Sequence, residues 1–408
     1  MNKILTASLD WVDTRFPLSK MWNEHLAQYY APKNFNVWYY FGSLALLVLV
    51  LQIVTGIFLA TNYKPDAALA FGTVEYIMRD VEYGWLIRYM HSTGASFFFI
   101  VVYLHMFRAL LYGSYRKPRE LLWIIGMFIY LCLMAESFLG YLLPWGQMSF
   151  WGAQVIISLF GAIPWVGEDL AVWVRGDYVI ADATLNRFFV YHVVLVPIIL
   201  LGLAVVHIIA LHEVGSNNPD GIEIKKNKDP ETGIPRDGIP FHPYYTVKDI
   251  FGVAVFLILF SWVLFYAPEL GGYFIEHNNF FPADPMKTPT HIAPLWYFTP
   301  FYAILRAVPE KLLGVIAMGA AIFVLFLLPW LDRSPVKSIR YKGWIFKLAL
   351  ALFIISFFGL CYLGMEAPTQ TKTWFARLFS VIYFGFFLLM PWYSKWDKTK
   401  PVPERVTD

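Results

Sequence analysis

The chain has 408 residues, of which 58% are hydrophobic, 19% aromatic and only 15% charged, and its formal net charge is +3. An ordinary soluble domain of this length carries far more charge, so the composition excludes that class and predicts an integral membrane protein. The small excess of positive charge reflects the Lys and Arg residues in the loops on one side of the membrane, as described below. We therefore expect no nucleic-acid partner.

Eight segments are long and apolar enough to cross a bilayer, which takes roughly 20 residues of helix. They are centred within residues 37–61, 85–111, 121–143, 187–211, 249–267, 311–331, 343–365 and 373–393. The expected fold is an all-α membrane protein with eight transmembrane helices. An even number of spans puts both termini on one side, and Lys and Arg are concentrated in the loops of that side. The positive-inside rule therefore predicts that both termini are cytoplasmic.

The segments around these spans indicate five regions. Residues 1–36 carry charge and tryptophan without an apolar core, which is typical of an interfacial segment and not of a cleavable signal peptide. The other regions are a front four-helix bundle (37–212), a polar cytoplasmic linker loop (213–248), a C-terminal four-helix region (249–393) and a cytoplasmic tail (394–408). Two long outer loops, tryptophan-rich 144–186 and proline-rich 268–310, are the expected places for a site.

The two cysteines, Cys132 and Cys361, both lie within predicted spans, and the chain has no C-x-x-C-H motif. We therefore expect no disulfide, no cysteine metal site and no covalently attached haem.

Two of the spans each carry two histidines, His91 with His105 and His192 with His207. His91 and His105 are 14 residues apart, about 21 Å along a helix, and His192 and His207 are similarly distant, too far for two histidines of one helix to share a ligand. Pairing must therefore run between helices, His91 with His192 near the outer face and His105 with His207 near the inner face. Two facing imidazoles can hold an iron porphyrin by its axial positions, and two such sites make an electron path across the membrane.

Glycines and arginines bear on the same interpretation. Each of the two neighbouring spans has two glycines 14 residues apart, where a flat macrocycle could approach the backbone. The four glycines are Gly42, Gly56, Gly126 and Gly140. The alternatives are small-residue helix packing for the glycines and a hydrogen bond to a neighbouring helix for each histidine. Arg88 and Arg108, each three residues from a histidine, either pair with haem propionates or extend to the membrane surface.

Six stretches of the chain resemble one family. They are GWLIRYMHSTGASFFFIVVYLH, GYLLPWGQMSFWGA, RFFVYHVV, LHEVGSNNP, FHPYYTVKDI and WYFTPFYAILRAVPEK. In this order they resemble cytochrome b of the cytochrome bc1 complex, the quinol:cytochrome c reductase, over most of the chain. Both halves are fused here, unlike in the split b6f type.

The resemblance implies two non-covalent b-type haems and two quinone sites. Quinol at the outer site would give one electron to a Rieske iron–sulfur protein and the other to the outer, low-potential haem. The inner, high-potential haem would reduce quinone at the inner site, and the cycle would contribute to the proton gradient. A c-type cytochrome (cytochrome c1-like), membrane lipid and a second copy of the complex are the other expected partners.

The resemblance also assigns residues. The haem-iron ligands fall on the four paired histidines, and the inner quinone site falls on His212, Ser216, Lys248 and Asp249. An imidazole and a carboxylate could hold the two quinone oxygens there; the alternatives are an interface role for His212 and a helix N-cap for Asp249. The outer quinol site is expected between residues 141–152 and 294–302. Its candidates are Tyr141, Pro294, Trp296, Tyr297 and Tyr302, although tryptophans there are also typical membrane-interface anchors.

One departure from the family concerns the fourth predicted span, residues 187–211. His192 and His207 are 15 residues apart, whereas the usual bc1 spacing is 14. One extra residue turns a ligand by about 100°, so the helix must absorb it locally, and Pro197 favours a bend or bulge at that point.

A second departure concerns the outer site. The family's Pro-Glu-Trp-Tyr motif reads Pro294, Leu295, Trp296 and Tyr297 here, and leucine cannot accept a quinol proton. Glu136 lies near the outer end of the third span, where a carboxylate is costly unless used. One hypothesis is that Glu136 replaces the missing acceptor, with Tyr302 or Tyr141 positioning the quinol. The alternative is a structural hydrogen bond from Glu136 to a neighbouring helix.

Two other functions remain as alternatives. One is a different di-haem cytochrome, such as the membrane anchor of a dehydrogenase, and the other is a transporter whose histidines relay protons. The fused halves and cytoplasmic termini favour a bacterial plasma membrane, although a mitochondrial inner membrane would show the same pattern.

Overall fold

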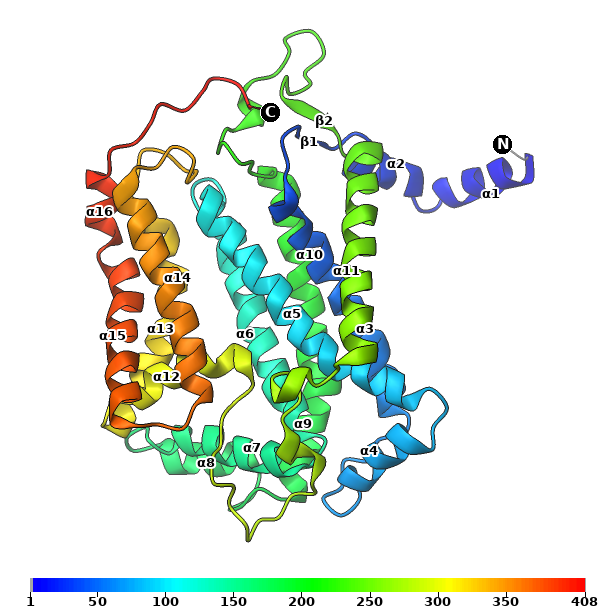
Figure 1. Ribbon diagram of the computed structural model, residues 1–408. Helices are drawn as coiled ribbons and strands as arrows, with labels where there is room; N and C mark the ends of the chain where they lie inside the picture. Colours follow the sequence, from blue (N-terminus) through cyan, green and yellow to red (C-terminus); the bar gives the residue numbers. More distant parts are fainter. Residues whose placement is uncertain (1–2, 408) are drawn as a thin grey trace.

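The computed structural model describes residues 3–407. Its long helices lie side by side in a bundle, with short helices and loops at both ends (Figure 1). Seven helical segments in these residues are long and apolar enough to cross a membrane: Val37–Ala60, Gly84–Tyr112, Glu120–Leu142, Asp182–Val214, Phe241–Tyr266, Lys311–Leu331 and Trp344–Met365. An eighth is a pair, α15 (Gln370–Leu388) and α16 (Met390–Trp396), bent by 62°. The predicted all-α membrane fold with eight spans is confirmed when this bent pair counts as one.

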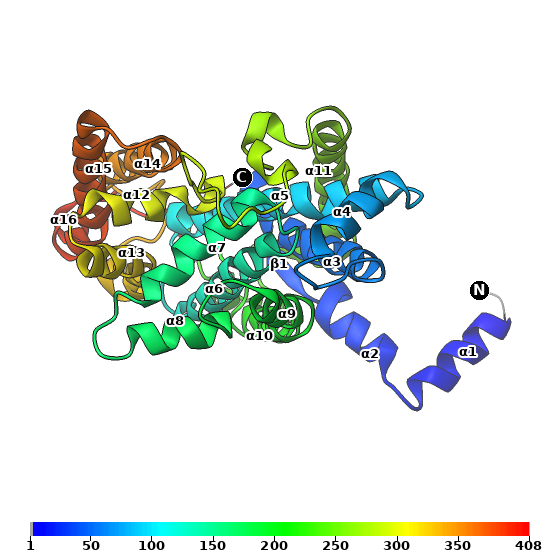
Figure 2. The same ribbon diagram turned by 90° about the horizontal axis from the view of Figure 1, so that it is seen from below.

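Several of these segments are built from more than one helix. The first joins the 3-10 turn η2 (Val37–Tyr39) to α3 (Tyr40–Ala60), and the fifth joins η5 (Phe241–Tyr245) to α11 (Thr246–Tyr266). The single helices are α5 (Gly84–Tyr112), α6 (Glu120–Leu142), α13 (Lys311–Leu331) and α14 (Trp344–Met365). Seen along the bundle, α12 (Thr299–Ala307) to α16 gather on one side, and α3, α5, α10 (Val196–Val214) and α11 on the other (Figure 2).

The fourth segment explains how the extra residue between His192 and His207 is accommodated. It consists of α9 (Asp182–Val190), the π-helical turn η3 (Tyr191–Leu195) and α10 (Val196–Val214). A π turn holds one more residue than an α turn, so it cancels the rotation that the extra residue would cause. Pro197 directly follows it, and because proline has no N–H, the preceding turn lacks a helical donor at this point, which favours a local bulge. The bulge therefore lies where the sequence predicted it.

Short elements cap the end of the bundle that the sequence predicts to face outward, called the outer end below; the opposite end is called the inner end. These are α4 (Ala70–Arg79), α7 (Gln147–Phe160), α8 (Gly167–Arg175), η6 (Leu270–Gly272), η7 (His277–Phe280), η8 (Trp296–Phe298) and α12 (Thr299–Ala307). A separate apolar cluster forms there, with Leu142, Ile157 and Leu185 almost completely buried. The two long outer loops are therefore folded onto the bundle and can build a site against it.

The inner end carries the polar linker, the N-terminal segment and the tail. The N-terminal elements are α1 (Lys3–Asp13), α2 (Leu18–Trp22) and η1 (Asn23–Ala27), of which α1 projects away from the bundle (Figures 1 and 2). Strand β1 (Tyr30–Pro32) pairs antiparallel with β2 (Gly238–Pro240), Tyr30 opposite Pro240. The linker also contains η4 (Ile224–Lys226). This small sheet ties residues 30–32 to the linker loop over the inner face.

Candidate functional site

Two pairs of histidine rings face each other between α5 and the η3–α10 segment. The ring centroids of His91 and His192 lie 6.1 Å apart, and those of His105 and His207 lie 6.4 Å apart. Two metal–nitrogen bonds of about 2 Å each, added to the distance from each ring nitrogen to its ring centroid, come roughly to this centroid separation. Each pair therefore has room for one metal ion between its imidazoles. The structure brings together the same pairs that the spacing predicted.

The four predicted glycines lie directly behind the four histidine rings. Added Cβ atoms would come within 3.1 Å of the His91 ring at Gly56, 3.3 Å of His105 at Gly42 and 3.2 Å of His207 at Gly126. At Gly140, a Cβ would overlap the ring of His192. The absence of a side chain at these glycines therefore determines how far apart the two imidazoles of a pair can lie. General packing of small residues between helices would not require a glycine behind each ring.

The outer pair is held through its Nδ1 atoms. The Thr55 hydroxyl oxygen lies 3.0 Å from Nδ1 of His91, and the same hydroxyl lies 2.7 Å from the carbonyl of Leu51, to which it donates. It therefore accepts from His91. Nδ1 of His192 lies 2.9 Å from the carbonyl oxygen of Glu136. Anchoring Nδ1–H in this way fixes the ring and leaves Nε2 free as a metal ligand, so His91 and His192 fit the role of residues that would hold a haem iron.

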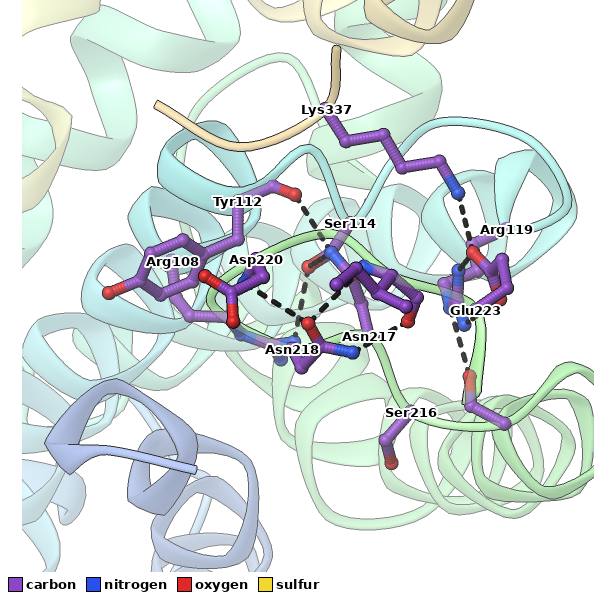
Figure 3. Close-up of polar contacts among 12 residues, drawn as sticks. Arg108, Tyr112, Ser114, Arg119, Ser216, Asn217, Asn218, Asp220, Glu223 and Lys337 are labelled. Carbon is purple, nitrogen blue, oxygen red and sulfur yellow. Dashed lines mark hydrogen bonds and ion pairs between the residues drawn. The ribbon is translucent and has the colours of Figure 1, made fainter. Parts of the chain in front are cut away.

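A buried polar cluster lies at the inner end of α5 (Figure 3). The amide nitrogen of Asn217 donates to the Tyr112 carbonyl at 2.8 Å and to the Ser114 hydroxyl at 3.2 Å. The Arg108 guanidinium lies 3.2 Å from Nδ1 of His105 and 3.5 Å from Ser114. Nε of Arg108 and Oδ1 of Asn217 are buried and have no partner in the described chain. Buried polar atoms are usually satisfied, and an arginine without a carboxylate partner fits an anionic group such as a haem propionate.

The linker loop is locked onto this cluster by an ion-pair network. Glu223 receives two hydrogen bonds from the guanidinium of Arg119, at 2.6 and 2.9 Å, and a third from Lys337 (Figure 3). Burial opposes the charge of Glu223, but Arg119 and Lys337 outweigh it and hold the pKa of Glu223 below its usual value. Arg119 also donates to the carbonyl of Gly215 at 2.9 Å. Residues 215–223 are thereby fixed against the start of α6.

The inner quinone residues form a partly connected group around Tyr29. The ring of Tyr29 stacks on His212 with centroids 4.6 Å apart, and its hydroxyl lies 3.1 Å from the hydroxyl of Ser216. Lys248 lies over the ring of Tyr245, 5.2 Å from its centroid. Tyr29 was missed in the sequence because its segment reads as an interfacial collar, and only its aromatic neighbours hinted at a ring-lined site.

Asp249 lies in the first turn of α11, as predicted, and its contact is with Ser43 of α3. Two residues of the predicted inner set, His212 and Ser216, thus share Tyr29, whereas Asp249 packs toward α3. The set encloses the inner end of the bundle from α10, α11 and the segment before β1.

The outer candidates meet at the end of α6. Tyr297 is 1% exposed, stacks on Phe99 with centroids 3.8 Å apart and forms a hydrogen bond with Ser137. Trp296 donates to the Ser96 hydroxyl at 3.2 Å. These contacts fix residues 294–298 against α5 and α6. They also give Trp296 a buried polar partner, unlike a membrane-surface anchor.

Tyr141 lies at the end of α6, and Tyr302 lies in α12. The carbonyl of Tyr141 accepts a hydrogen bond from Ser149 at the start of α7. Tyr302 donates to the Ile292 carbonyl at 3.2 Å, and the guanidinium of Arg306 lies 4.6 Å from its ring centroid. Pro294 and Leu295 are both partly buried. The outer candidates therefore come from the end of α6 and from the 294–302 segment, which is joined to α6 through Tyr297 and Ser137.

Glu136 does not face the 294–302 segment in this structure. Its neighbour Ser137 makes the contact with Tyr297, while the carboxyl oxygen Oε1 of Glu136 lies 3.0 Å from Nδ1 of His192. Successive side chains of a helix point about 100° apart, so Ser137 contacts the 294–302 segment whereas Glu136 contacts the helix that carries His192. The geometry favours the second role expected for Glu136, a contact with a neighbouring helix.

Comparisons with known proteins agree with this architecture. Residues 26–215 match the family model "Cytochrome b/b6/petB", and residues 282–384 match "Cytochrome b(C-terminal)/b6/petD". The chain is 66% identical to the cytochrome b of Allochromatium vinosum, with all of both chains covered, and 47% identical to that of Rickettsia typhi over the same extent. A solved chain of a hyperthermophilic respiratory Complex III superposes with a TM-score of 0.87 at 39% identity, covering 95% of this chain and 98% of that one.

Family, relatives and fold therefore all point to a haem-binding, multi-pass membrane subunit of a multi-subunit complex. Because both family models match and the identity extends over the whole chain, the chain belongs to the cytochrome b/b6 family, as the core redox subunit of a complex III-type quinol:cytochrome c oxidoreductase.

Proposed function

We propose that this chain carries electrons across the membrane through two b-type haems, oxidising quinol at an outer site and reducing quinone at an inner one. The observation that carries the proposal is the pair of facing imidazoles at two levels, 6.1 and 6.4 Å between centroids, each ring backed by a glycine. Bound haem would supply one-electron transfer at each level.

His91 and His192 would hold the outer haem, and His105 and His207 the inner one. Thr55 and the Glu136 carbonyl orient the outer rings through Nδ1. At the inner level, Nε of Arg108 is a buried donor without a partner, and it would donate a hydrogen bond to a propionate oxygen. Arg88, at the opposite end of α5, would do the same for the outer haem. The four glycines keep side chains away from the ring faces.

At the outer site, the protein would hold a flat quinol between aromatic and proline-lined walls. Tyr297 and Trp296 are fixed by Ser137 and Ser96, so the loop that begins at Pro294 is rigid. Rigid aromatic walls position a ring and exclude water from it. Tyr141 and Tyr302 would place their side chains near the quinol hydroxyls. Quinol oxidation releases two protons and two electrons, and Leu295 cannot receive a proton.

At the inner site, the protein would bind quinone and deliver protons to it. His212 and Ser216 are joined through Tyr29, and an imidazole is a suitable proton donor near neutral pH. Lys248 and Asp249 lie in the first turn of α11, where Lys248 contacts the ring of Tyr245 and Asp249 contacts Ser43. Reduction of quinone to quinol takes up two electrons, which the inner haem would supply, and two protons.

The remaining parts of the function need other chains. A Rieske iron–sulfur protein would accept one electron from quinol at the outer site, and a c-type cytochrome would be a further, separate electron carrier. One relative, from Bradyrhizobium diazoefficiens, bears the name "Cytochrome b/c1" and is longer than this chain. We place the subunit in a bacterial plasma membrane with both termini cytoplasmic, in a dimeric complex surrounded by lipid.

The proposal is tested by the absorption difference between dithionite-reduced and oxidised membranes. The unaltered complex should show two b-type bands. His192→Leu should remove one band and His207→Leu the other, while His277→Leu, an exposed histidine outside both pairs, should keep both. A spectrum in which His192→Leu and His207→Leu keep two bands would reject the ligand assignment.

A further inference from the structure

The two histidine pairs have the same backbone surroundings but different side chains at one position. Gly140 lies behind His192 and Gly126 lies behind His207, 14 residues apart on α6. One helical turn before each glycine stand Glu136 and Leu122. The same position of α6 therefore carries a carboxyl group at the outer level and an alkyl group at the inner level.

This difference reaches the imidazole itself. At the outer level, Nδ1 of His192 forms a hydrogen bond with the Glu136 carbonyl oxygen at 2.9 Å, and the Glu136 carboxyl oxygen Oε1 lies 3.0 Å from the same Nδ1. At the inner level, the Leu122 backbone approaches His207, but Nδ1 of His207 is buried and makes no hydrogen bond that meets normal geometry within residues 3–407. The ring of His192 is thus anchored at Nδ1 by oxygen atoms of Glu136, whereas the ring of His207 has no such anchor.

The other groups around the two levels do not cancel this difference. Arg88 lies near His91, and Arg108 lies near both His105 and His207, so each level has one arginine. On the α5 side, His91 meets the acceptor Thr55 at 3.0 Å, whereas His105 meets Arg108 at 3.2 Å. Each polar contact that differs between the two levels therefore gives the outer histidines more hydrogen-bond acceptors at Nδ1 than the inner histidines have.

The chemical effect of such a contact has a definite direction. An acceptor on Nδ1–H makes the imidazole a stronger donor through Nε2 and stabilises the more oxidised metal. Hydrogen bonding around the axial ligands is one of the means by which a protein sets a haem potential. A carboxyl oxygen on one axial ligand therefore lowers the reduction potential of that haem relative to one without it.

We propose that Glu136 is a positioning residue for His192 whose carboxyl contact lowers the reduction potential of the outer haem below that of the inner haem. The consequence is downhill electron transfer from the outer to the inner level, in the direction that the proposed function requires. The inference rests on that function, because it needs a haem at each level. It also explains why a carboxyl group is kept inside the membrane although it points away from the 294–302 segment.

The test is a potentiometric titration of both b-type bands in the intact complex carrying Glu136→Leu, which copies the inner level, or Glu136→Gln. We expect Glu136→Leu to raise the outer midpoint potential, Glu136→Gln to raise it less, and the inner midpoint to stay unchanged as an internal control. A tenfold loss of preference for the oxidised state corresponds to about 59 mV for one electron. The reciprocal variant, Leu122→Glu, should lower the inner midpoint.

Three results would overturn the proposal. The first is an unchanged outer midpoint in Glu136→Leu with both bands present. The second is loss of the outer haem from Glu136→Gln, which would make Glu136 a residue for haem assembly. The third is slower reduction of the outer haem by quinol with unchanged midpoints, which would make Glu136 a proton acceptor. Failure of the proposed function is distinguishable, because the unaltered complex would then lack two b-type bands.

Discussion

The backbone of Gly140 lies against the imidazole of His192, so closely that a Cβ at position 140 would overlap the ring. Gly140→Ala should therefore displace His192 and weaken or abolish the outer b-type band, while the inner band stays. Forcing an extra methyl group into a packed interior costs about 1–3 kcal/mol. Gly202→Ala on α10 is the control, since a Cβ there meets nothing within 4 Å. Retention of a normal outer band in Gly140→Ala would show that the ring position is not set by this glycine.

The hydrogen bond between Tyr297 and Ser137 should matter for quinol oxidation. Tyr297→Phe and Ser137→Ala each remove it, and each should slow reduction of the outer haem by quinol severalfold when the inner site is blocked. The effects of two substitutions that remove the same contact are not additive, and their interaction energies are typically about 0.5–3 kcal/mol. The double variant should therefore be little slower than either single variant. Fully additive losses would mean that the two side chains act separately.

Tyr29 should contribute to the inner site. Tyr29→Phe keeps the ring that stacks on His212 but removes the hydroxyl that contacts Ser216. We expect a severalfold loss in reoxidation of the inner haem by quinone for Tyr29→Phe and a larger loss for Tyr29→Ala. Reduction of the outer haem by quinol serves as the control and should be unaffected. Equal rates in all three proteins would remove Tyr29 from the site.

The C-terminal tail should be docked on the linker loop through Asp237 and Asp220. Arg405 donates two hydrogen bonds of 2.8 Å to Asp237, and the backbone nitrogen of Thr407 donates to Asp220 at 2.9 Å. The tail crosses the inner face to reach them (Figure 1). Arg405→Ala should expose the last residues to carboxypeptidase at neutral pH, whereas Lys398→Ala should not. Equal digestion of the two variants would contradict the docking.

The same contact predicts a pH dependence. The hydrogen bond from Arg405 holds the pKa of Asp237 below its usual value of 3.8. A carboxylate with a lowered pKa contributes stability that is present above its unfolded pKa and is lost as the pH falls through its folded pKa. Tail docking should therefore persist from neutral pH to about pH 4 and weaken only below it. Because the Arg405 side chain is half exposed, we expect a small contribution, measurable by hydrogen exchange of residues 405–407.

Much of the fold could be predicted from the sequence, because long apolar segments and the spacing of histidines and glycines follow directly from helix geometry. The π turn at Tyr191–Leu195 was also foreseeable from the 15-residue spacing and Pro197. The contacts of Tyr29 and Arg405 were not, since they join residues more than 160 positions apart. The direction of the Glu136 side chain depended on the rotation of α6 against η3, which no local pattern specifies.

The most direct test of the account is the number of haem b molecules bound per copy of this chain in the purified complex, with their reduction potentials. The account predicts two haems per chain that titrate as two separate one-electron steps. A single haem per chain, or none, would contradict the assignment of both histidine pairs.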